Sequence, residues 1–174
     1  MRMPLLAAGI ALSGGSAPPV LLVPASTWAI VAAETEDSVG CFMAAELGRG
    51  ATLAVGVWHG LTGHDRISLA FQQDDWNVAA AGPLTATVAV DGVPVPLEDL
   101  PAPLPSGTGF SLPLPAAPAL FDRLAAGARL DVTVGGIALA VDLTAAGASF
   151  VETVACAAAQ PMPPPHPPGA VHAL

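Results

Sequence analysis

The chain has 174 residues, of which 53% are apolar, 11% charged and 5% aromatic, and it contains 19 Pro and 18 Gly. This length predicts one domain, and the absence of a three-residue glycine period excludes a collagen-like chain. The net charge is −9, with five Arg and no Lys. Nucleic-acid binding and lysine chemistry such as Schiff-base formation are therefore not expected, because both depend on basic residues that this chain lacks.

The first 25 residues have the pattern of a secretory signal peptide. Arg2 precedes an apolar stretch over Pro4–Leu12, and small residues follow. We expect cleavage after Ala25 rather than after Ala17, because Pro18 would directly follow the second cut. The stretch is too interrupted to span a bilayer. These features predict a periplasmic or secreted protein without a transmembrane span; the alternative is an Ala-rich N-terminus of a cytosolic protein.

The only two cysteines are Cys41 and Cys156. In an exported protein such a pair is expected to form a disulfide. The bond would join the beginning of the domain to its end and stabilise it by about 4 to 5 kcal/mol through the lost entropy of the unfolded chain. A CxxC redox motif is absent from the sequence, so thiol exchange is not expected.

The clearest elements are three β-hairpins, which we place at 52–72, 85–97 and 130–143. In the last of them, the Gly135-Gly136 turn sets a register that pairs Val134 with Ile137 and the other large apolar residues with one another. Strands are also indicated by the weaker patterns Trp28–Ala33 and Cys41–Glu46, which flank an acidic turn at Glu34–Ser38.

The Asp91-Gly92 turn of the second hairpin pairs Val90 with Val93, Val88 with Val95 and Ala86 with Leu97. Pro94 and Pro96 then fall where their missing amides would point away from the partner strand. This arrangement predicts that 93–97 is an edge strand that is protected from pairing with another chain.

Two short helices complete the expected fold. One covers about 118–126, with Pro at its start and Gly127 as its stop. The other covers about 150–159 and begins at a capping box formed by Ser149 and Glu152, although the segment remains ambiguous between helix and strand. The six prolines in the segment 100–118, counting Pro118 itself, predict a long extended crossover.

The expected organisation is thus a signal peptide at 1–25, a single domain at 26–159 and a disordered Pro-rich tail at 160–174. The fold class is α+β, dominated by an antiparallel sheet with two short helices.

Trp58 lies on the strand face that also carries Ala54 and Gly56. Another layer of the same domain is expected to cover this small-residue face. The alternative is that the face and its tryptophan form a binding surface.

The loop of the first hairpin contains His59, His64 and Asp65, which together are candidate metal ligands. Their spacing matches no strong metal motif, and such residues are ordinary in hairpin loops. We therefore assign no metal, cofactor or catalytic residue, and keep this set as a candidate only.

Several short motifs follow one another in a suggestive order: Val39–Cys41 after a Trp-led strand, Val90–Gly92, Phe121–Gly127, Asp142-Leu143 and then Cys156. In this order the region 39–156 resembles small exported proteobacterial proteins of the invasion-associated locus B type. The resemblance implies a β-rich secreted or periplasmic envelope protein that is linked to host-cell interaction, and it implies no catalytic residues.

The expected function is therefore that of an exported, non-catalytic envelope or secreted protein that mediates protein or surface interactions. Its expected partner is another envelope or host protein. Two alternatives remain open: a metal-dependent hydrolase that uses the loop 59–65, and a periplasmic small-ligand binder with a pocket between sheet and helices.

Overall fold

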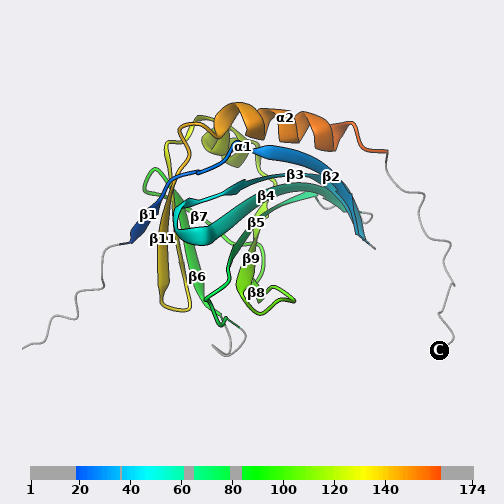
Figure 1. Cartoon of the computed structure of the whole chain (residues 1–174). Coiled ribbons are helices and arrows are strands. Elements are labelled where there is room, and N and C mark those ends of the chain that lie inside the picture. Colours follow the sequence, from blue (N-terminus) through cyan, green and yellow to red (C-terminus); the bar gives the residue numbers. More distant parts are fainter. Residues whose placement is uncertain (1–18, 36, 61–64, 79–83, 162–174) are drawn as a thin grey trace, which may run out of the picture.

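The protein is a two-sheet structure with a pair of helices over one end of the sheets (Figure 1). The computed structural model describes residues 19–35, 37–60, 65–78 and 84–161. Its strands are mostly antiparallel and both helices are short, so the expected α+β class is confirmed. Most of the expected signal peptide, His64 and the tail from residue 162 lie outside the described residues.

One sheet has five strands in the order β1-β11-β10-β6-β7. Their bounds are Val20–Leu22 for β1, Ile137–Asp142 for β11, Arg129–Val134 for β10, Ala86–Val90 for β6 and Val93–Val95 for β7. The expected register of the hairpin β10–β11 is confirmed, since Val134 lies opposite Ile137. Gly135 and Gly136 both have positive φ, at 54° and 88°, as a two-residue hairpin turn of this hand requires.

The hairpin β6–β7 forms as expected in its first part. Val90 pairs with Val93 and Val88 with Val95, and β7 is an edge strand. The expected pairing of Ala86 with Leu97 is wrong, because β7 ends at Val95. Beyond it, the backbone N–H of Glu98 donates a 2.9 Å hydrogen bond to a carbonyl of the other sheet, which draws the chain away from β6.

The other sheet has six antiparallel strands in the order β2-β3-β4-β5-β9-β8. Their bounds are Ala29–Glu34 for β2, Ser38–Glu46 for β3, Ala51–Gly60 for β4, Asp65–Gln73 for β5, Gly109–Pro115 for β9 and Ala102–Pro103 for β8. A short 3-10 turn, Gly48–Gly50, joins β3 to β4. This sheet contains the expected hairpin 52–72 and both weaker strand candidates.

Strand β9 corrects the expectation of an extended crossover at 100–118. Its alternate residues Leu112 and Leu114 pair with β5, while the carbonyl of Pro113 accepts the N–H of Glu98 on the opposite side. In an antiparallel strand, the N–H and C=O of one residue point the same way. The position of the missing N–H of Pro113 therefore faces away from β5, and this proline costs no hydrogen bond to that strand.

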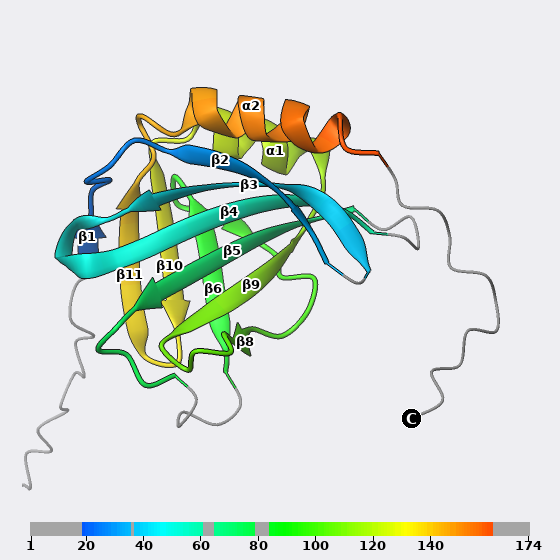
Figure 2. The same ribbon diagram turned by 45° about the vertical axis from the view of Figure 1, so that its right-hand side comes forward.

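The core lies between the two sheets and under the helices (Figure 2). Alternate residues are buried along β3, β4, β5, β9 and β10, so each of these strands turns one face to the core. The largest fully buried side chains are those of Phe71, Phe110, Phe150, Met43, Leu53, Ile67, Leu69, Leu112, Leu114, Leu130, Val90 and Val132.

Helices α1 (Pro118–Ala126) and α2 (Gly147–Ala158) pack on each other, with the rings of Phe121 and Phe150 stacked at 6.1 Å between centroids. The segment expected at 150–159 is therefore a helix, but the capping box is wrong. Ser149 lies inside the helix, whose N-cap is Ala146 without a side-chain bond.

The earlier start of α2 is explained by a close approach between the two helices. A Cβ on Gly147 would lie 2.2 Å from the carbonyl oxygen of Ala125. The chain therefore needs a glycine where it meets α1, and the helix begins at that glycine.

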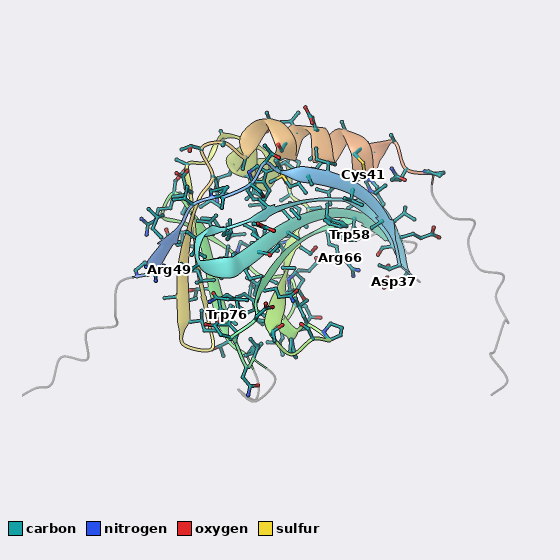
Figure 3. The ribbon with its side chains drawn as sticks, viewed as in Figure 1. Asp37, Cys41, Arg49, Trp58, Arg66 and Trp76 are labelled. Carbon is teal, nitrogen blue, oxygen red and sulfur yellow. A yellow bond between two sulfur atoms is a disulfide. The ribbon has the colours of Figure 1, made fainter. Side chains whose placement is uncertain are left out.

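The expected disulfide between Cys41 and Cys156 is present and attaches α2 to β3. Cys41 is fully buried on the core side of the sheet, and Figure 3 shows it directly beneath α2. In the part of the chain that the structure describes, neither helix has the length and apolar character needed to cross a membrane.

Residues 20–25, which the sequence assigned to the signal peptide, take part in the fold. β1 pairs in parallel with β11, and Leu22 is 2% exposed. The N–H of Gly48 donates to the carbonyl of Val23 at 2.9 Å, and the N–H of Ala25 donates to that of Glu46 at 2.7 Å.

Candidate functional site

The outer face of the six-stranded sheet, which points away from the core, carries mainly small side chains. The strand register brings Ala44 of β3, Ala54 of β4 and Ala70 of β5 into one row, and Gly56 lies next to it. Both helices and the five-stranded sheet pack on the core side, where Cys41 lies. The expectation that another layer of the domain covers the face with Trp58 is therefore wrong for the described residues.

A groove with a volume of about 630 Å³ lies at one end of this outer face. Its floor is formed by Trp58 of β4, Arg66 and Ser68 of β5, and Ser111 and Pro113 of β9. The volume falls within the range typical of small-ligand sites. The groove lies on the outer face and not between sheet and helices, where the sequence had suggested a pocket.

Two loops form the walls of the groove. Thr35 and Asp37, from the turn between β2 and β3, form one wall, and residues 98–102 form the other. The second wall is attached to the sheet, because Glu98 is hydrogen-bonded to Pro113 and Ala102 pairs with Ser111. Leu100 stands on its rim with 73% of its surface exposed.

The indole of Trp58 is fixed at its nitrogen edge. Its Nε1–H donates a 2.8 Å hydrogen bond to Ser68 Oγ on the neighbouring strand. The same edge lies over Gly56, where an added Cβ would be 2.3 Å from Nε1. The rest of the half-buried ring lines the groove. The backbone at Gly56 and the hydroxyl of Ser68 together determine its orientation.

Arg66 is the cross-strand neighbour of Trp58 in the pairing of β4 with β5. Its Nη2 donates to Ser38 Oγ at 3.3 Å and lies 3.8 Å from Asp37 Oδ1. Both contacts use one nitrogen, and 43% of the side chain is exposed. The guanidinium is therefore positioned by the β2–β3 turn while it keeps N–H donors for a ligand.

Asp37 is held as an anion by its own turn. The Thr35 hydroxyl donates to Asp37 Oδ1 at 2.9 Å, and the Ser38 hydroxyl lies at 3.2 Å. These hydrogen bonds, first that of Thr35 and then that of Ser38, lower the pKa of Asp37 below its ordinary value, and the charge of Arg66 adds to the effect. Asp37 therefore stays charged at any pH near neutrality.

The charges that line the groove are mixed. Asp37, Glu98 and Asp99 are acidic, and Arg66 is the basic residue among the described residues that line it. Asp99 Oδ1 accepts the backbone N–H of Leu100 at 2.7 Å, which fixes the direction of that carboxylate. The groove therefore offers donors and acceptors side by side, with an excess of acceptors.

Of the candidate metal ligands, His59 and Asp65 lie on the face of the sheet opposite to that of Trp58. His59 alternates with Trp58 along β4, and its Nδ1 lies 2.9 Å from Asp65 Oδ1. His64 lies outside the described residues, within which no group of three or more His, Cys, Asp or Glu side chains is placed to hold a metal ion. The candidate set of three remains a prediction.

The alternation of residues along the strands predicts part of the groove from the sequence. Arg66 and Ser68 alternate with the buried Ile67 and Leu69, and this period places them on the face of Trp58. Asp37 was identified only as part of a charged turn. The wall at 98–102 had no signal, because its position depends on the strand β9 that the prolines concealed.

Comparison with known proteins yields no relatives: no family model, no curated protein and no solved structure matches this chain. The geometry of the site is therefore the evidence for what this protein does.

Proposed function

We propose that this chain is an exported, non-catalytic binding protein of the cell envelope or the extracellular space. Its binding surface is the outer face of the six-stranded sheet, and its partner belongs to the envelope or to a host. The groove beside Trp58 is the observation that carries this proposal. It places a positioned aromatic ring, a guanidinium and three carboxylates on an uncovered sheet face.

Export is supported by the disulfide Cys41–Cys156, since such bonds persist in oxidising compartments. It is also supported by the signal-like pattern of the first residues. Because β1 and Leu22 belong to the fold, we propose that cleavage falls after Ala17 and not after Ala25. The mature protein then keeps β1.

The resemblance to exported proteins of the invasion-associated locus B type remains part of this proposal. An acidic, disulfide-bonded β-sheet protein with an open face is compatible with the role that the resemblance implies.

Photo-crosslinking in the cells that export the protein tests the binding surface. A photoreactive phenylalanine analogue replaces Leu100 at the rim of the groove, or replaces Val151 on α2, which is 58% exposed and serves as the control. We expect an adduct of increased mass from position 100, lost when Arg66→Gln is added, and none from position 151. Equal adducts from both positions, or none from position 100, would contradict the proposal.

A further inference from the structure

The groove on the outer sheet face combines a flat apolar surface, the indole of Trp58, with polar side chains around it. The indole of Trp58 is fixed by Ser68 and Gly56 and offers its remaining ring surface to a ligand. Hydroxyl, guanidinium and carboxylate groups from four separate segments of the chain surround it. Such a site favours a ligand that is itself apolar on one face and rich in hydrogen-bonding groups at its edge.

The charges of the groove residues restrict which ligands fit, since they disfavour both anionic and cationic ones. Asp37, Glu98 and Asp99 outnumber Arg66, and the whole chain carries a net charge of −9, so an anionic ligand is disfavoured. A cationic ligand stacked on the ring of Trp58 would lie next to Arg66 on the adjacent strand and be repelled by the like charge of its guanidinium. A neutral ligand that both donates and accepts hydrogen bonds avoids both penalties.

We propose that the groove binds a neutral saccharide, an assignment that rests on the proposed binding function and specifies its ligand. A sugar ring presents C–H groups on its faces and hydroxyl groups at its edge. One face of the ring contacts the indole of Trp58. Its hydroxyls accept hydrogen bonds from Arg66 and donate to the carboxylates of Asp37 and Glu98.

The test uses the full exported protein and soluble trisaccharide probes in isothermal titration calorimetry. The neutral probes are maltotriose, cellotriose and tri-N-acetylchitotriose; trigalacturonate is the anionic probe, and the glucosamine trimer is the cationic one. The variants are Trp58→Ala and Arg66→Gln. Their matched controls are Trp76→Ala and Arg129→Gln, since Trp76 stacks on Phe110 and Arg129 pairs with Asp131, both away from the residues that line the groove.

We expect at least one neutral trisaccharide to bind in about the millimolar range or tighter, and more tightly than either charged probe. Trp58→Ala should weaken its binding at least about tenfold and Arg66→Gln several-fold, with both control variants unchanged. Far-UV circular dichroism verifies that each variant is folded. Trp58→Phe, which keeps an aromatic ring, should retain part of the affinity.

Three results would overturn the assignment: no binding of any neutral probe at about 10 mM, tighter binding of a charged probe, or equal losses in Trp58→Ala and Trp76→Ala. If the adduct at position 100 nevertheless forms and depends on Arg66, the binding function stands and only the saccharide assignment is lost. If that adduct is absent as well, both proposals fail.

Discussion

Gly56 shows how a single missing side chain shapes the groove, because its Cα lies beneath the indole of Trp58. A Cβ there would lie 2.3 Å from Trp58 Nε1 and 2.8 Å from Ser68 Oγ. We expect Gly56→Ala to displace the ring and to lower the free energy of unfolding by about 1 to 3 kcal/mol in urea denaturation. Gly48→Ala is the control, since its Cβ would meet its nearest neighbour at 3.8 Å. Equal stabilities of the two variants would show that the indole can move aside without a loss of stability.

Asp37 gives the β2–β3 turn a dependence on pH. Its pKa in the folded protein is lowered by Thr35 and Ser38, so the carboxylate stabilises the fold above its unfolded-state pKa, and this contribution is lost as the pH falls through the lower, folded-state value. We expect Thr35→Val to raise the pKa of Asp37 toward its ordinary value, measured by NMR titration of the side-chain carboxyl carbon.

The control for the titration of Asp37 is Thr144→Val. Thr144 lowers the pKa of Asp142 by two hydrogen bonds at the far end of β11. This variant should move the pKa of Asp142 and leave that of Asp37 in place. An unchanged Asp37 titration in Thr35→Val would mean that the turn hydrogen bonds do not set its pKa.

At the scale of elements, the disulfide joins α2 to the core side of β3 across 115 positions of the chain. Replacing both cysteines by alanine should lower the free energy of unfolding by about 4 kcal/mol, because a long closed loop restricts the unfolded chain. Hydrogen exchange should show the largest loss of protection in α2, whose far end the bond anchors. A uniform loss across both sheets would instead indicate that α2 is required for the core to form.

The sequence predicted those elements whose local signals are strong. The Gly135-Gly136 and Asp91-Gly92 turns determine their hairpins, because few residues adopt the positive φ that such turns need. Strand β9 was missed although Phe110, Leu112 and Leu114 alternate along it. Its prolines are typical of a break in a strand. Only the hydrogen bond from Glu98 to the carbonyl of Pro113 shows that the missing N–H of Pro113 faces away from β5.

The groove was predictable only in part, because some of its features depend on contacts between segments that are distant in the sequence. Alternation along β4 and β5 places Trp58, Arg66 and Ser68 on one face, which is local information. Whether that face is covered depends on where the helices pack, and the walls come from segments distant in sequence. The start of α2 likewise depends on the contact of Gly147 with Ala125, which no capping pattern encodes.

At the scale of the whole molecule, the segment 20–25 connects the two sheets. β1 adds to the five-stranded sheet through β11, while the N–H of Ala25 and the carbonyl of Val23 bond to the end of β3 and the turn after it. Leu22 contributes to the shared core. A chain that begins at Ser26 therefore loses a strand, a buried leucine and the backbone bonds between the sheets.

We expect a chain that begins at Pro18 to be more stable than one that begins at Ser26 by at least about 2 kcal/mol, the value of burying Leu22 alone. Thermal and urea unfolding of both proteins measure the difference, and Leu22→Ala in the longer chain separates the side chain from the backbone pairing. Intact-mass analysis of the exported protein should give the mass of a chain that starts at residue 18. A mass corresponding to a start at Ser26, together with equal stabilities, would remove β1 from the mature fold and leave β11 as the edge of its sheet.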